Sequence, residues 1–202
     1  MNASRKHITL ILTLFLACSA FTLHAAPPET VVPQARLTPE WRAERHAEKV
    51  AQAKTGKAKL VMIGDSITHN WEKQKNYAEI FAPYNTLNLG FGGDRTQHVL
   101  WRLQNGEIDG IAPKLVTMMI GTNNIKRDEP TDIALGIKAI IAELRQRLPA
   151  SKIVVFPIFP RNHTRTEGDF EAVKEVNKLL PALADGKQVF HVDIGQNFMD
   201  DR

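Results

Sequence analysis

From residue 60 onward, short apolar runs alternate with segments of helical periodicity. The runs, each as long as a buried strand, cover residues 60–63, 86–89, 115–120, 153–156 and 189–194. The intervening segments, which the pattern predicts as helices, are 67–81, 96–103, 133–148 and 170–183. This alternation is typical of βαβ units. We therefore predict an α/β fold of the three-layer, flavodoxin-like kind, with a five-stranded, mostly parallel sheet.

The N-terminus follows a different pattern. Arg5 and Lys6 precede an apolar stretch over residues 8–21, and two alanines, Ala25 and Ala26, follow it. This is the layout of a secretory signal peptide, and the stretch is short for a membrane span. We predict a signal peptide over residues 1–26, with an uncleaved membrane anchor as the alternative.

The chain after this leader is predicted to divide into a linker and one domain. Residues 27–37 contain three prolines and are predicted as a linker. A helix is predicted over residues 39–54, because Thr38 offers an N-cap and Pro39 suits the first helical turn. The domain is predicted to span residues 38–202, with no integral membrane segment once the leader is removed.

Composition and the leader limit the kinds of partner and the cellular compartment that we expect for this protein. The formal net charge is +4, and no basic tract with interleaved aromatic residues occurs, so nucleic acid is not an expected partner. The single cysteine, Cys18, lies in the leader, so the mature chain is expected to form no disulfide. The signal peptide predicts a secreted or periplasmic protein.

Three loops that carry polar or glycine residues follow the first three predicted strands. They cover residues 64–66 (Gly-Asp-Ser), 90–94 (Gly-Phe-Gly-Gly-Asp) and 121–124 (Gly-Thr-Asn-Asn). In an open α/β sheet, ligands bind outside the carboxyl ends of the strands, so these loops are expected to gather at one edge. The second loop matches neither a dinucleotide fingerprint nor a phosphate-binding loop with Gly-Lys-Ser/Thr.

These loops offer the parts of an acyl-transfer site. Ser66 supplies a hydroxyl at a strand-to-helix turn, where its own N–H can face a developing oxyanion. Gly93 is the candidate for a second main-chain donor, and Asn123 for a carboxamide donor. Asp65 and Gly92 are expected to support the oxyanion hole. Each feature also has a purely structural interpretation: a helix cap, a glycine turn or an Asx turn.

Taken in this order, the three loops resemble the blocks of the SGNH, or GDSL-type, hydrolase family, and in particular its platelet-activating-factor acetylhydrolase-like branch. The segments that carry the resemblance are residues 88–96, 98–103, 105–107, 113–114, 121–124 and 136–140. The resemblance implies that Ser66 is the nucleophile and that Gly93 and Asn123 complete the oxyanion hole with the Ser66 amide. It also implies ester hydrolysis without a metal or cofactor, usually of short acyl groups such as acetyl. The expected partner is a small acylated substrate, an acetylated carbohydrate or lipid.

One part of the family pattern is missing. The family's general base is a histidine in a closing Asp-x-x-His motif, which this sequence does not contain. Four histidines are candidates for this role, and none has a carboxylate partner at a suitable spacing, so the sequence assigns no base: His69, His98, His163 and His191. We expect it beyond residue 202, together with a last helix that the chain lacks. The alternative is a chain that ends here naturally and is catalytically impaired.

Two further functions remain open. A non-catalytic surface or carbohydrate-binding protein could be built on the same sheet. A lipase for long acyl chains would need a wide apolar groove beside Ser66, and the sequence shows no lid insertion.

Overall fold

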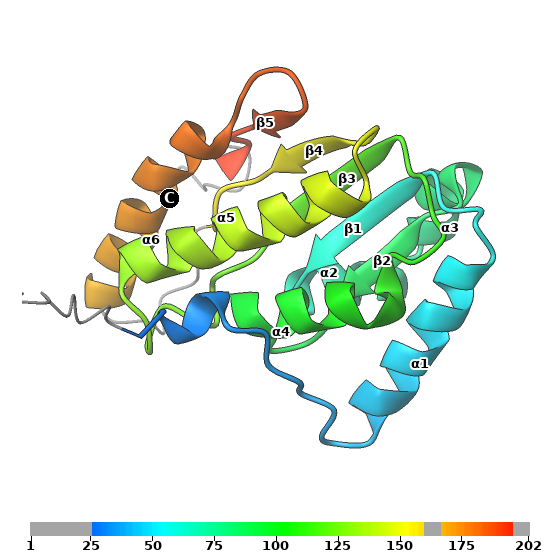
Figure 1. Ribbon diagram of the computed structural model, residues 1–202, viewed down its shortest axis with the longest axis horizontal. Coiled ribbons are helices and arrows are strands. Elements are labelled where there is room, and N and C mark those ends of the chain that lie inside the picture. Colours follow the sequence, from blue (N-terminus) through cyan, green and yellow to red (C-terminus); the bar gives the residue numbers. More distant parts are fainter. Residues whose placement is uncertain (1–25, 160–166, 196–202) are drawn as a thin grey trace, which may run out of the picture.

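The central sheet confirms the predicted α/β architecture. The computed structural model describes residues 26–159 and 167–195. Its five strands, all parallel, lie in the order β2-β1-β3-β4-β5 (Figure 1). The strands are β1 (Leu60–Gly64), β2 (Leu87–Gly90), β3 (Leu115–Met119), β4 (Lys152–Val155) and β5 (Val189–His191).

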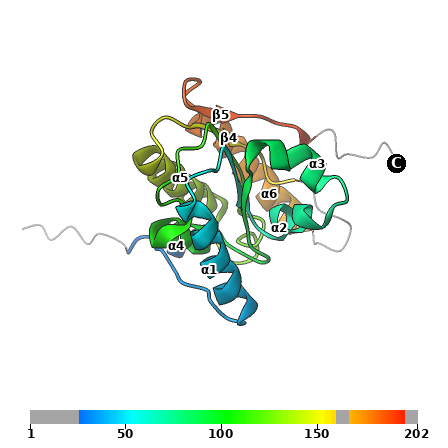
Figure 2. The ribbon, with the colours of Figure 1, turned by 90° about the vertical axis from the view of Figure 1, so that its right-hand side faces the viewer.

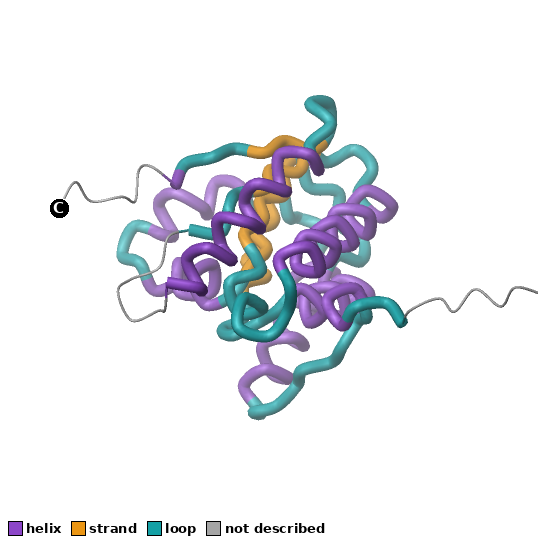
Figure 3. The backbone as a smooth tube through the Cα atoms, turned by 90° about the vertical axis from the view of Figure 1, so that its left-hand side faces the viewer, coloured by secondary structure: helices purple, strands orange, loops and turns teal. Residues whose placement is uncertain are grey.

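Helices cover both faces of this sheet, as three layers require. They are α1 (Trp41–Lys54), α2 (Ser66–Asn70), α3 (Tyr77–Phe81), α4 (Thr96–Arg102), α5 (Pro130–Arg147) and α6 (Glu167–Leu179). The neighbouring helices α4, α5 and α6 pack on one face, while α2 and α3 lie on the other (Figures 1 and 2). Helix α1 packs beside β2. In Figure 3 the strands form one layer between helices. No helix follows β5 within the described residues.

The helix predicted over residues 67–81 is wrong as a single element. The structure divides it into α2, a 3₁₀ turn over Trp71–Lys73 and α3. The intervening residues 72–76 are Glu-Lys-Gln-Lys-Asn, without an apolar side chain to hold a continuous helix against the sheet. At Gln74 the backbone is extended, with φ −76° and ψ 138°. The serine therefore begins a helix of only five residues.

The segment predicted as a linker lies against the body of the domain. Thr30 is fully buried, and its hydroxyl donates a hydrogen bond to the carbonyl oxygen of Asp132 at the start of α5, 2.6 Å away. Its own carbonyl accepts from the Thr96 hydroxyl on α4 at 3.0 Å. The Gln34 N–H donates to the Gln97 carbonyl at 3.0 Å. We call residues 26–37 the N-terminal strap, since they tie together α4 and α5.

The two faces of the sheet differ in how well they are covered. Beneath α4, α5 and α6, alternate strand residues such as Val61, Val116 and Ile153 are fully buried. On the opposite face, Met62 and Thr117 are only half-buried. They line an apolar cavity of about 290 Å³, which extends to Ile67 at the start of α2. None of the described helices combines the length and hydrophobicity needed to cross a membrane.

Candidate active site

The first loop is shaped by a close approach between strand and helix. A Cβ on Gly64 would stand 2.0 Å from the Thr68 hydroxyl oxygen and 2.8 Å from the Met119 carbonyl oxygen, so only glycine fits there. Asp65 then caps α2, and its Oδ1 accepts a hydrogen bond from the Ile67 N–H at 2.9 Å. Ser66 follows as the first, half-buried residue of the helix.

The second loop lies directly beside this serine. Strand register pairs Gly64 with Gly90 on one side and with Met119 on the other, so all three loops start at the same edge. A Cβ on Gly92 would stand 3.9 Å from the Ser66 Cβ, 3.9 Å from His69 Nδ1 and 3.8 Å from the Trp41 ring. The structure therefore brings Ser66 and Gly92 together across the loop edge.

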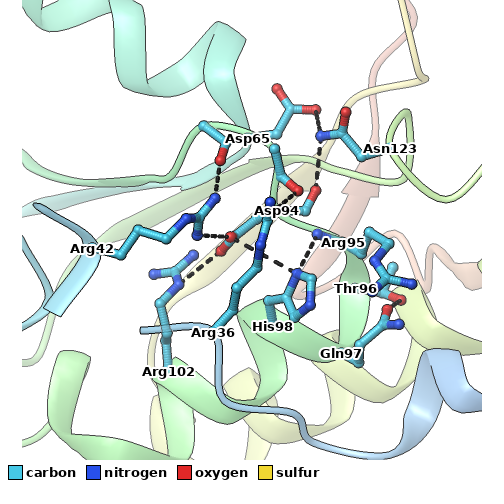
Figure 4. Close-up of polar contacts among 12 residues, drawn as sticks. Arg36, Arg42, Asp65, Asp94, Arg95, Thr96, Gln97, His98, Arg102 and Asn123 are labelled. Carbon is cyan, nitrogen blue, oxygen red and sulfur yellow. Dashed lines mark hydrogen bonds and ion pairs between the residues drawn. The ribbon is translucent and has the colours of Figure 1, made fainter. Parts of the chain in front are cut away.

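Asn123 joins all three loops. Its Nδ2 donates a 2.9 Å hydrogen bond to the main-chain carbonyl of Asp94 in the second loop (Figure 4). The same nitrogen lies 3.5 Å from Asp65 Oδ2 in the first loop, at the outer limit of a hydrogen bond. One amide hydrogen is thus firmly held. The other is held only weakly and is available to a stronger acceptor such as an oxyanion.

The carboxyl group of Asp65 is electrostatically unusual. Burial, with the nearby Asp94 carboxylate adding to it, raises the pKa of Asp65 to about 6, against a smaller opposite effect of its hydrogen bond from the Ile67 N–H. The side chain is fully buried. At neutral pH, the negative charge of Asp65 next to Ser66 therefore lowers the stability of the folded protein.

Asp94, at the end of the second loop, is the centre of a buried ionic cluster. Arg42 from α1 contacts its Oδ1 at 2.7 Å, and Arg102 from α4 contacts its Oδ2 at 2.9 Å (Figure 4). Arg102 also pairs with the buried Glu107. His98 lies 3.9 Å from Asp94 and accepts a hydrogen bond from the Arg95 N–H at 3.1 Å. Burial lowers the pKa of His98 to about 4, despite the favourable carboxylate.

Sequence analysis missed Arg42 and the second asparagine of the third loop. Asn124 is fully buried, and its carboxamide bonds Asp128 at 2.9 Å and Gln97 at 3.2 Å, which fixes this loop to α4. For Arg42 a signal existed. The buried stripe of α1 consists of Arg42, Arg45, Lys49 and Ala53, so its inward face is basic where a packing face is normally apolar.

The candidate base histidines lie in different parts of the structure. His69 packs on Trp41 with ring centroids 5.7 Å apart, and burial lowers its pKa. His98 faces the Asp94 cluster, His191 lies in β5, and His163 lies outside the described residues. Within the described ranges, no group of three His, Cys, Asp or Glu side chains is placed to hold a metal ion.

Comparison with known proteins identifies the family. A model of the GDSL-like lipase/acylhydrolase family matches residues 62–202, which include all three loops. The chain belongs to this family. Platelet-activating factor acetylhydrolase IB subunit alpha1 of Homo sapiens is 38% identical over 146 residues, which cover 72% of this chain and 62% of that protein. Subunit alpha2 of Rattus norvegicus is 37% identical over 159 residues, which cover 77% of this chain and 68% of that protein.

Solved structures share the fold. A GDSL-like lipase from Bacteroides thetaiotaomicron superposes with a TM-score of 0.64 at 18% identity, covering 79% of this chain and 80% of that one. A carbohydrate acetylesterase from Sinorhizobium meliloti gives a TM-score of 0.58 at 20% identity, covering 69% and 85%. The predicted resemblance to the acetylhydrolase-like branch of the SGNH hydrolases is thereby confirmed, and so is the flavodoxin-like fold.

Proposed function

We propose that this protein is a secreted or periplasmic serine esterase that removes short acyl groups, acetyl above all, from a carbohydrate or lipid ester. The observation that carries the proposal is the Asn123 carboxamide, which bonds the second loop and approaches the first beside Ser66. The relatives named as acetylhydrolases support the short acyl group. The signal-peptide pattern of residues 1–26 supports export.

In this proposal Ser66 attacks the ester carbonyl. The N–H groups of Ser66 and Gly93 and the Asn123 carboxamide stabilise the oxyanion that forms, and water then hydrolyses the acyl-enzyme. Asp65 and Gly92 support the arrangement, one through its contact with Asn123 and the other by leaving space beside Ser66. The proton transfers need a base, and no histidine of the described residues is assigned to that role.

The test is hydrolysis of p-nitrophenyl acetate by the purified chain and by its Ser66→Ala variant. We expect the variant to lose the turnover that depends on the Ser66 nucleophile and to keep at most the small residual rate that an oxyanion hole and substrate binding support. Ser151→Ala is the matched control, since Ser151 lies next to the amino end of β4, away from the loop edge. Among the described residues, its hydroxyl bonds only the Pro113 carbonyl. Equal rates for the wild type and Ser66→Ala would refute the nucleophile. A secreted product that does not begin at Pro27, measured by mass spectrometry, would refute the cleavage site.

A second candidate, hydrolysis of longer acyl chains, is favoured by the apolar cavity. Ile67 and Thr68, the two residues after Ser66, line it together with Met119 and Phe159. A chain-length series from p-nitrophenyl acetate to octanoate separates the two candidates. A kcat/KM that rises with chain length would favour the second over the first.

A further inference from the structure

The Gly92–Gly93 peptide carries the main-chain donor of the proposed oxyanion hole, and its two flanking residues leave it free to rotate. Neither residue has a side chain to oppose a flip of the peptide plane, and Gly93 has a φ of +77°, which favours glycine. Within the described part of the chain, the Gly93 N–H has no hydrogen-bond partner. Something other than the sheet must therefore hold this peptide in one orientation.

The structure shows what holds it. The Arg42 guanidinium donates a hydrogen bond to the Gly92 carbonyl oxygen, and a second nitrogen of the same group contacts Asp94 Oδ1 at 2.7 Å. In a trans peptide, the carbonyl of one residue and the N–H of the next point in opposite directions. Fixing the Gly92 carbonyl toward Arg42 therefore fixes the Gly93 N–H on the side away from Arg42.

Arg42 is itself held rigidly. Its side chain is 1% exposed, Asp94 is fully buried, and Arg102 binds the other oxygen of that carboxylate at 2.9 Å. The planar fork of a guanidinium can bridge a carboxylate and a carbonyl at once, which an ammonium group does less well. A second arginine, Arg36 of the N-terminal strap, donates to the next carbonyl along the loop, that of Gly93.

We propose that Arg42, assisted by Arg36, is a positioning residue that holds the Gly92–Gly93 peptide with the Gly93 N–H directed into the oxyanion hole. The inference rests on the proposed function for its catalytic consequence. Both arginines lie before residue 62, where the family match begins, so the donor is oriented by a part of the chain outside that match.

The test compares two lysine substitutions on one helix. Arg42→Lys keeps a positive charge beside Asp94 but removes the fork. Arg45→Lys is the matched control: Arg45 is also buried and bonds the carbonyls of Gly90 and Asn88, at 3.0 and 3.2 Å. The peptide after Gly90 is fixed independently, because the Phe91 N–H bonds the Gly64 carbonyl at 3.2 Å.

For p-nitrophenyl acetate, we expect Arg42→Lys to lower kcat about tenfold or more with KM within about twofold, because an oxyanion donor acts in the transition state. Arg45→Lys should lower thermal stability comparably and leave kcat unchanged. Equal losses of kcat in both variants, or an unchanged kcat in Arg42→Lys, would overturn the proposal. If Arg42→Lys does not fold, Arg36→Gln replaces it, with an expected loss in kcat of about threefold and the same KM.

A second readout does not depend on catalysis. The nitrogen–proton residual dipolar coupling of the Gly93 amide reports its direction, and we expect it to change in Arg42→Lys and to stay as in the wild type in Arg45→Lys. An unchanged coupling in Arg42→Lys refutes the positioning role. If the wild type shows no Ser66-dependent turnover but the coupling changes as expected, the proposed function fails while the positioning of the peptide stands.

Discussion

The buried carboxyl group of Asp65 should make the stability of this protein depend on pH in an unusual direction. Its pKa rises from 3.8 to about 6 on folding. Below pH 3.8 both the folded and the unfolded chain carry the proton. Between these values the unfolded chain loses it and the folded chain retains it. Stability is therefore greatest at acid pH with respect to this group and is lost as the pH rises through 6.

The size of the loss follows from the shift. Each pKa unit corresponds to about 1.4 kcal/mol, so a shift of about two units costs about 3 kcal/mol at neutral pH. Asp65→Asn removes the charge and keeps the helix cap, since asparagine accepts the Ile67 N–H as well as aspartate does. We expect the variant to gain about 3 kcal/mol over the wild type between pH 4 and pH 7.

Urea unfolding followed by tryptophan fluorescence at pH 4, 5, 6 and 7, at fixed ionic strength, measures this difference. Asp193→Asn, at an exposed position, controls for the general loss of a carboxylate. A difference between Asp65→Asn and wild type that stays constant over the whole range would refute the reasoning. It would mean that the folded protein stabilises the carboxylate as well as water does.

Two further predictions concern Asn123 and His98. Asn123→Ala should lower kcat for p-nitrophenyl acetate by about 10²–10³ with little change in KM, as expected for one oxyanion donor; a rise in KM at constant kcat would contradict that role. The pKa of His98 falls from 6.5 to about 4, so this group stabilises the fold above pH 6.5 and the benefit, about 3 kcal/mol, is lost as the pH falls through 4. His98→Gln should remove this acid-side loss in urea unfolding, and an unchanged slope between pH 4 and pH 6.5 would count against it.

The sheet could be predicted from sequence because its strands are buried on at least one face. Runs such as residues 60–63 and 115–120 are apolar except for Thr117, and they coincide with β1 and β3 to within a residue. The helix predicted over residues 67–81 failed for the opposite reason. Its apolar residues lie at the two ends, Ile67 and Phe81 among them, and the polar middle offers nothing to pack.

At the candidate site, the sequence located the three loops but did not identify the buried side chains that hold them. Loop positions follow from strand ends, so Ser66, Gly93 and Asn123 could be named from spacing and resemblance. Of the partners of Asp94, Arg102 is eight residues away, but Arg42 lies 52 residues earlier in the chain. Hydrophobic periodicity predicts an apolar residue at an inward position of a helix. Here the inward Arg42 makes the contact with Asp94 instead.

The N-terminal strap shows how a proline-rich stretch can stabilise the fold although its sequence predicts a linker. Its bonds to the helices end on the main-chain oxygens of Asp132 and Gln97, and a third starts from the Thr96 hydroxyl and ends on the strap's own backbone at Thr30. The bond from Gln34 to Gln97 is main-chain at both ends, whereas the other two need the hydroxyl groups of Thr30 and Thr96 as donors. The path of the strap is therefore fixed by a few hydrogen bonds that the hydrophobic pattern of the sequence does not reveal.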